Sequence, residues 1–359
     1  MSRAAVLALC AAMLLGGCGA GMSPAPVIAP IQAVTSVTPS ATGIPLGVAV
    51  LGEYEFVSVQ QTGQIFTYSV ASGAQAPAVQ PYSTPCADPS GMVLASIAGK
   101  NVMAVPCYDT GTLLTLSVAA DGSLSALGSV SGLGTPYPGT ALDGTNVLVP
   151  LFGASQSANG GVAKIDISSP AKPVITGVAT LASPGPGEFA NPGALTVANG
   201  YIYVAAGSES YPTATSSTIQ VVQESTMTVV GSPLVVAHSP QQIAVQGSVA
   251  FVTFYDAMQL ESIDISQRAS LNVLQVYSLG NVPGCHALPV VTRNSSAYVG
   301  CNAEGAVEKV DISNPAAMAT VQAIEGIAAP QEMAFAGQSL LVTSSVNGGS
   351  VYDVYVGSN

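Results

Sequence analysis

Charged residues are scarce in this 359-residue chain, where Asp, Glu, Lys and Arg make up only 7% of the total. Soluble proteins carry about 25% charged residues on average, so the composition excludes a helical protein covered with Lys–Glu ion pairs and a charge-rich disordered protein. Cations are the scarcest, with 7 Lys and Arg against 19 Asp and Glu. A phosphate-binding surface needs several converging cations, and we therefore expect no nucleic-acid partner.

With so few charges, the surface must be covered by Ser, Thr, Gln, Asn, Ala and Gly. These residues suit exposed strand faces and turns better than helices, which favour Ala, Leu, Glu, Lys, Gln and Arg. The 38 Gly and 25 Pro add to the supply of turn residues. The composition therefore predicts an all-β protein.

The N-terminus has the pattern of an export signal. Arg3 precedes an apolar run, Ala4–Leu15, that is too short to span a bilayer and matches a signal-peptide core. The run ends in Leu15-Gly16-Gly17-Cys18, which resembles the bacterial lipobox. This resemblance implies that residues 1–17 are a lipoprotein signal peptide, that Cys18 carries the lipid, and that the protein is anchored to the outer membrane, since Gly19 and not Asp follows. The alternative is an ordinary secretory signal with an incidental cysteine.

The segment 18–43 begins with Cys18, is rich in Pro, Ala, Ser and Thr after it, and holds no charged residue. Its prolines favour extended backbone, so we interpret it as a semi-rigid tether between the lipid and the folded body. Within it, Ile31–Thr38 alternates apolar and polar residues like a strand. We expect this strand to complete the last repeat of the body, with a simple tether as the alternative.

From residue 44 to residue 359 one pattern recurs: an apolar strand, a turn with Gly or Asn, a second β-rich run, another turn and a third strand. Seven units start near residues 44, 91, 139, 193, 241, 288 and 331. Their spacing, roughly 40 to 50 residues, is typical of four-stranded propeller blades. The seventh unit ends after its third strand, so an N-terminal strand is needed to close the ring. The sequence thus predicts a seven-bladed β-propeller domain over 44–359.

The third strands carry a short motif, I-D-I-S-x-P, seen in Ile165–Pro170 and, as V-D-I-S-N-P, in Val310–Pro315. It resembles the bacterial YVTN and LVIVD β-propeller repeats, which share a fold but not an activity. The acidic residue recurs at one repeat position, so we expect it to cap turns in all three units that keep it: Asp166, Asp264 and Asp311. Aromatic residues on the second strands should pack between blades: Tyr54, Tyr201, Tyr203, Phe251 and Tyr298.

Four cysteines remain in the body, and an even number in an exported chain predicts disulfides. Cys86 precedes the first strand of unit two and Cys107 follows its second strand, and Cys285 and Cys301 stand at the matching places in unit six. Because first and second strands are antiparallel neighbours, Cys86–Cys107 and Cys285–Cys301 can each close within one blade. No Cys or His spacing typical of zinc sites occurs.

The loops that lead into first strands and leave second strands share one face of a propeller, which we call the mouth. Titratable residues are concentrated in these loops, which hold several acids and both histidines: Asp88, Asp109, Glu188, Glu209, His238, Asp256, His286, Glu304 and Glu332. They could hold a metal ion or supply acid–base groups, as in propeller lactonases. The alternative is that surface loops simply carry the few charges of the chain.

No nucleophile elbow, P-loop or dinucleotide-binding glycine motif is present in the sequence. The absence of Trp also removes the docking motifs of quinone-dependent propellers. The sequence therefore predicts a non-catalytic binding or scaffolding module of the cell envelope, without a cofactor. Its partners would be the membrane, through the N-terminal lipid, and an unknown envelope protein or small molecule. A lactonase-like or metal-assisted hydrolase is the second hypothesis.

Overall fold

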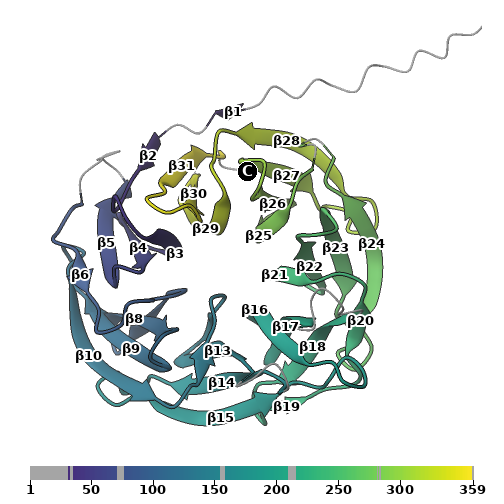
Figure 1. The fold of residues 1–359 in the computed structure, drawn as a ribbon, viewed down its shortest axis with the longest axis horizontal. Helices are drawn as coiled ribbons and strands as arrows, with labels where there is room; N and C mark the ends of the chain where they lie inside the picture. The colour runs from purple at the N-terminus through teal and green to yellow at the C-terminus, as the bar shows by residue number, and fades with distance from the viewer. Residues whose placement is uncertain are drawn as a thin grey trace, which may run out of the picture.

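The computed structural model describes residues 31–32, 35–70, 77–153, 158–208, 216–280, 282 and 284–357. These residues form seven sheets arranged in a ring, a seven-bladed β-propeller, and the strands that follow one another within each blade are antiparallel (Figure 1). The predicted fold class is therefore confirmed. Within the described ranges there is no helix of sufficient length and apolarity to span a membrane. The predicted signal peptide, Cys18 and most of the predicted tether lie outside the described residues.

Each blade is a sheet whose first strand lies nearest the ring axis. The first strands are β3 (Ile44–Leu51), β7 (Val93–Ile97), β12 (Ala141–Asp143), β16 (Ala190–Ala198), β21 (Pro240–Gln246), β25 (Ala287–Arg293) and β29 (Pro330–Ala336). The second strands are β4 (Tyr54–Gln60), β8 (Lys100–Cys107), β13 (Asn146–Phe152), β17 (Tyr201–Ser208), β22 (Val249–Phe254), β26 (Ser296–Cys301) and β30 (Ser339–Ser344). The blades begin within a few residues of the predicted starts.

The third strands are β5 (Gln64–Ser69), β9 (Thr112–Val118), β14 (Gly161–Asp166), β18 (Ser217–Gln223), β23 (Gln259–Asp264), β27 (Ala306–Asp311) and β31 (Val351–Tyr355). Outer strands follow as β6 (Tyr82–Ser83), β10 (Leu124–Ser131), β15 (Val174–Thr180), β19 (Thr228–Val229) with β20 (Leu234–Val236), β24 (Asn272–Ser278) and β28 (Ala319–Glu325). In blade three, β11 (Thr135–Pro136) also pairs with β13.

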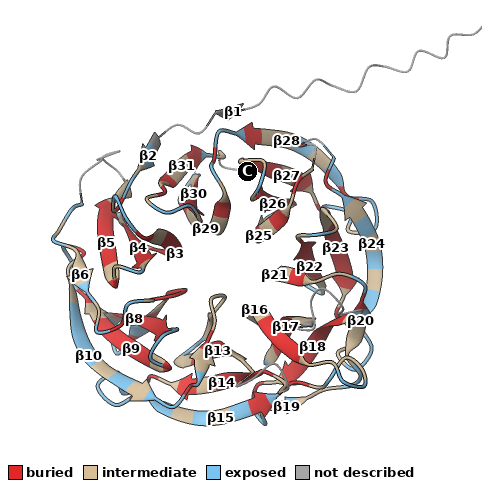
Figure 2. Cartoon of the chain, in the orientation of Figure 1, coloured by how far each residue is buried: buried red, intermediate tan, exposed pale blue. Residues whose placement is uncertain are grey.

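Burial along the strands follows their place in the ring (Figure 2). The middle strand β4 is buried over five successive residues, because neighbouring blades cover both of its faces. The outer strands β15 and β24 alternate between exposed and partly buried residues, because only one of their faces meets the protein. A tight turn at Asn199 and Gly200, both with positive φ (53° and 75°), joins β16 to β17.

Aromatic side chains fill the spaces between blades. Tyr203 of blade four packs in one buried cluster with Val252 of blade five, and Phe251 of blade five packs with Val299 of blade six. Tyr298 of blade six similarly joins a cluster with Leu340 of blade seven. Tyr54 and Tyr201 lie against such inter-blade clusters as well. The predicted packing role of these five residues is confirmed.

Buried hydroxyl groups on second strands join neighbouring blades close to the axis. Ser58 donates to the carbonyl of Ser90 in the next blade at 3.0 Å, and Thr253 donates to the carbonyl of Leu288 at 2.7 Å. Thr343 of blade seven donates to the carbonyl of Leu46 in blade one at 2.9 Å, which links the two ends of the ring. These bonds fix the first strands that surround the channel.

The N-terminal segment closes the ring over a shorter stretch than predicted. The strand β2 (Thr35–Val37) pairs antiparallel with β31, and Val37 lies opposite Val351. The strand β1 (Ile31–Gln32) instead pairs in parallel with β28 of blade six. The pairing with β2 uses three of the five residues of β31, Val351 to Asp353.

Candidate functional site

Both predicted disulfides are present, one in blade two and one in blade six. Cys86–Cys107 joins positions 21 residues apart and Cys285–Cys301 joins positions 16 apart. Each ties the segment before a first strand to the end of the second strand, at the mouth. The prediction from repeat register is therefore confirmed.

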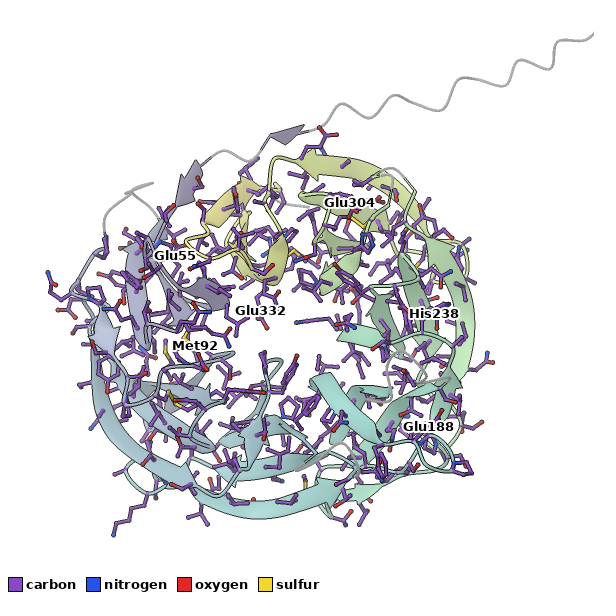
Figure 3. All side chains as sticks on the ribbon, in the orientation of Figure 1. Glu55, Met92, Glu188, His238, Glu304 and Glu332 are labelled. Carbon is purple, nitrogen blue, oxygen red and sulfur yellow. A yellow bond between two sulfur atoms is a disulfide. The ribbon has the colours of Figure 1, made fainter. Side chains whose placement is uncertain are left out.

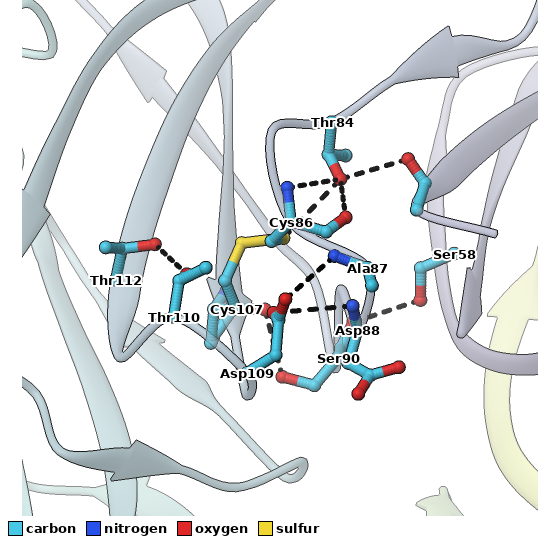
Figure 4. The surroundings of a disulfide bond; sticks show 12 residues. Ser58, Thr84, Cys86, Ala87, Asp88, Ser90, Cys107, Asp109, Thr110 and Thr112 are labelled. Atoms are coloured by element: carbon cyan, nitrogen blue, oxygen red, sulfur yellow. Dashed lines mark hydrogen bonds between the residues drawn. A yellow bond between two sulfur atoms is a disulfide. The ribbon is translucent and has the colours of Figure 1, made fainter. Parts of the chain in front are cut away.

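A carboxylate next to each disulfide binds the same two segments together. In blade two, Asp109 accepts hydrogen bonds from the backbone N–H groups of Ala87 at 3.0 Å and Asp88 at 3.4 Å (Figure 4). In blade six, Glu304 accepts one from the backbone N–H of His286 at 2.9 Å, and the Nδ1 atom of His286 lies 2.8 Å from its other oxygen. These two carboxylates are engaged by the protein's own donors.

Blade five has a looser version of this arrangement. The Nδ1 atom of His238 lies 3.3 Å from a carboxylate oxygen of Asp256, and both side chains are more than 40% exposed (43% and 46%). Glu261 of β23, in the same blade, is buried. This burial raises the pKa of its carboxyl, although the charge interaction with His238 opposes the shift. Glu261 stands at the repeat position of Glu308 in β27, whose carboxylate accepts a hydrogen bond from the backbone N–H of Val282 at 2.8 Å.

The third-strand aspartates of the repeat motif have the structural role that the sequence predicts. Asp166, Asp264 and Asp311 each accept a hydrogen bond from the backbone N–H two residues later, at 2.7, 2.8 and 2.9 Å. This backbone hydrogen bond is the main cause that lowers the pKa of each carboxyl. They cap turns away from the mouth.

A central cavity of about 620 Å³ opens at the mouth, and all seven blades contribute residues to its wall. Of the predicted mouth residues, Asp88 and Glu332 line this cavity. Figure 3 shows Glu332 at the inner edge of the ring, whereas Glu188, His238 and Glu304 lie out over their blades. The lining likewise omits Asp109, Asp256 and His286, and Glu209 lies outside the described residues. The predicted set therefore does not converge as one group in the described part of the chain.

Glu332 combines a position in the cavity wall with a shifted pKa, as a general acid or base would. Burial in the cavity wall raises the pKa of its carboxyl to about 7, and a hydrogen bond from the side chain of Gln242 opposes the shift. Gln242 belongs to blade five and Glu332 to blade seven, so the two approach each other across the channel. Asp88, the other cavity carboxylate, accepts a hydrogen bond from the backbone N–H of Gln61 at 3.1 Å.

Aromatic side chains form one wall of the cavity. The rings of Tyr108 and Tyr137 meet edge to face with centroids 6.3 Å apart, and Tyr137 stacks on Phe152 at 5.4 Å. The mouth prediction considered only charged residues and missed this wall. Tyr108 and Phe152 stand at the ends of second strands, so the register argument that selected the carboxylates would have found them.

Side-chain amides make up much of the remaining wall: Gln60, Asn191, Gln241, Gln242 and Gln331. Asn191 is only 3% exposed, and its Oδ1 accepts a hydrogen bond from the backbone N–H of Gly153 at 2.7 Å. Its Nδ2 has no acceptor among the described residues. An unsatisfied buried donor costs free energy.

The mouth carboxylates do not form a metal site within the described ranges. The one group of three potential ligands found there is Cys285, Cys301 and Glu308. Its two sulfur atoms are joined in a disulfide, and thiolates are the form of cysteine that binds metals. This group therefore belongs to the disulfide and not to a metal centre.

Comparisons with known proteins support the repeat fold. A family model described as the LVIVD repeat matches residues 297–324, which hold β27 and most of β26 and β28. This agrees with the resemblance seen in the third strands. A search of curated proteins finds no match.

Several solved structures are similar to the whole ring at low sequence identity. A catalytically inactive virginiamycin B lyase from Staphylococcus aureus, with Quinupristin, has a TM-score of 0.62 at 11% identity and covers 90% of this chain and 97% of that chain. BamB from Moraxella catarrhalis has a TM-score of 0.56 at 14% identity, covering 90% and 99%. The Swd1 β-propeller domain of Myceliophteria thermophila has 0.64 at 10%, covering 90% and 100%. At these identities the similarity establishes the fold alone.

Proposed function

We propose that this protein is a lipid-anchored propeller of the cell envelope that acts as a non-catalytic binding module, with the central cavity as its binding site. The observation that carries the proposal is that the mouth carboxylates and the cavity wall have different roles. The carboxylates of Asp109 and Glu304 are engaged by backbone donors, whereas the cavity offers an aromatic wall and neutral amides. Concave sites with apolar surface and a few placed polar groups are typical of ligand binding.

The proposed location at the membrane depends on Cys18, which would carry the lipid, and on the tether, which would hold the ring away from the membrane. The body has few cations, so attachment would depend on the acyl chains and not on anionic lipid. BamB is a propeller of similar fold, and we take it as a precedent for the architecture only.

Quantitative affinity purification tests the binding role. The full-length protein and its double variant Tyr108→Ala/Phe152→Ala are expressed at equal levels and captured from detergent-solubilised envelope. Molecules bound in the cavity should co-purify with the wild type and be lost from the double variant. Tyr355→Ala, a change at a 55% exposed tyrosine of β31, serves as the control and should retain them. Identical co-purifying sets from all three proteins would contradict a role for the cavity.

A hydrolase remains the second candidate because one observation favours it. Glu332 lies in the cavity with a pKa of about 7, which suits a general base or acid near neutral pH. Hydrolysis of an aromatic lactone or a chromogenic ester that disappears in Glu332→Gln and rises with an apparent pKa near 7 would support this candidate. No turnover above the Glu332→Gln variant would support the binding module.

A further inference from the structure

We propose that the central cavity binds a neutral carbohydrate, about the size of a di- or trisaccharide. This inference rests on the proposed function, since it names the ligand class of the same cavity. The volume, about 620 Å³, lies within the range of about 300–1,000 Å³ typical of small-molecule sites.

The aromatic wall provides the apolar half of sugar recognition. A pyranose ring presents one face of C–H groups, and an aromatic face is attracted to such weakly positive hydrogens because its π system is negative. Tyr137 and Phe152 stack at 5.4 Å, and Tyr108 adds an edge at 6.3 Å. Tyr108 is 40% exposed, so its ring remains available to a ligand at the mouth.

The amide groups provide the polar half. A hydroxyl group both donates and accepts hydrogen bonds, and a carboxamide is the uncharged side chain that offers both functions at once. Gln60, Gln241 and Gln331 bring amides to the wall from blades one, five and seven. Their positions on separate blades let them face different edges of one compact, many-hydroxyl ligand. The amide of Gln241 already donates to Ser239 at 3.4 Å. A purely apolar ligand would nevertheless cover Gln60 and Gln331 without offering their amides a partner, at a cost in free energy.

The charges of the cavity exclude other common ligands. No Lys or Arg lines it among the described residues, so phosphorylated or carboxylated ligands have no counter-charge there. Of the two carboxylates, Asp88 already accepts a backbone hydrogen bond, and Glu332 has a raised pKa of about 7 that leaves it partly protonated at neutral pH. A neutral ligand rich in hydroxyl groups therefore fits better than an anion.

An array of immobilised neutral oligosaccharides, probed with full-length protein in detergent, tests the inference. The array includes hexose and N-acetylhexosamine trimers, with sialylated and uronic-acid glycans as anionic controls. We expect binding to at least one neutral class and none to the anionic glycans. The dissociation constant is then measured by tyrosine fluorescence, which is readable because the chain has no Trp.

Variants distinguish binding in the cavity from binding to other surfaces of the protein. Tyr108→Ala should weaken binding at least tenfold while leaving the melting temperature unchanged, because the side chain is partly exposed. Gln331→Leu removes one amide and should also weaken binding, whereas Tyr355→Ala should not. Absence of binding to any neutral glycan, or binding that Tyr108→Ala and Gln331→Leu both leave intact, would overturn the inference. Envelope partners lost from the Tyr108→Ala/Phe152→Ala variant without any glycan binding would leave the binding module standing and remove only its carbohydrate ligand.

Discussion

The carboxylate of Glu304 binds His286 at two points, the backbone N–H at 2.9 Å and the ring Nδ1 at 2.8 Å. It does so directly beside the Cys285–Cys301 disulfide. Beside the Cys86–Cys107 disulfide, Asp109 accepts hydrogen bonds from the backbone N–H groups of two residues, Ala87 and Asp88. Two of the acids that the sequence marks as candidate mouth residues are thus hydrogen-bond acceptors for the loops in which they lie.

Removing these acceptors should reduce stability. We expect Glu304→Ala to lower the free energy of unfolding by about 1–2 kcal/mol, because backbone and ring donors lose a charged partner at a half-buried site. Asp109→Ala should cost less, about 1 kcal/mol, because Asp109 is exposed. Asp256→Ala removes an exposed ion pair and should cost less than about 0.5 kcal/mol. Urea unfolding measures all three, and equal small effects would show that Asp109 and Glu304 are not structural acceptors.

The disulfides should contribute more than the carboxylates. The double variant Cys285→Ser/Cys301→Ser frees a loop of 16 residues, which in the chain-entropy model lowers stability by about 3 kcal/mol. Chemical denaturation under non-reducing conditions measures the loss, and reduction of the wild type, which opens both disulfides, should lower stability further. Peptide mapping without reductant should recover Cys86 with Cys107, and a cross-blade pair would contradict the blade assignment.

Stability should fall as the pH rises from about 4.5 to 7, because of Glu55. Burial, and secondarily the charge of Asp353, raises the pKa of this carboxyl to about 7 in the folded protein. The folded state therefore holds a proton that the unfolded chain releases near pH 4.5, so its contribution is full below pH 4.5 and is lost by about pH 7. The shift corresponds to roughly 3 kcal/mol at most.

Glu55→Gln tests this pH dependence. The variant should match the wild type near pH 4.5 and exceed it at pH 8, as measured by thermal unfolding across the range. Glu332→Gln should flatten the remaining slope, since its carboxyl also has a pKa raised to about 7 by burial. Replacement of the exposed Glu53 by Gln is the control, and a wild-type curve without any slope between pH 4.5 and 7 would contradict the prediction.

Repeat architecture explains how much the sequence predicted. The positions of the disulfides and of Asp166, Asp264 and Asp311 follow from the register of a repeat, which is a local property of the chain. The shape of the cavity does not, because it depends on which side chains seven separate blades direct to one axis. Glu332 reaches the axis from β29 while Glu304, in the turn after β26, turns back to its own blade, although the sequence predicts both in mouth loops.

The N-terminal anchor remains a prediction that the described residues do not test. Cys18→Ser should leave the protein unprocessed or soluble, because the acyl chains have no attachment atom. Membrane fractionation with detection of the full-length chain measures the distribution. Recovery of the variant with outer membranes at the wild-type yield would contradict the lipoprotein assignment.

The last prediction concerns the closure of the ring at Val37. This side chain packs against the buried cluster of Tyr68 and Val351, whereas the adjacent Ser36 is exposed. Successive residues of a strand face opposite sides, so the two positions form a matched pair.

Val37→Asp places a carboxylate against apolar side chains and should separate β2 from β31, whereas Ser36→Asp should change little. Loss of β2 would expose the edge of β31, which can then pair with another molecule. We therefore expect Val37→Asp to lower the melting temperature by several degrees and to promote aggregation, measured by calorimetry and light scattering. If both variants behave like the wild type, β2 contributes nothing to closure, and the direct contacts between blades seven and one, among them Thr343 with Leu46 and Gly43 with Asn347, must hold the ring.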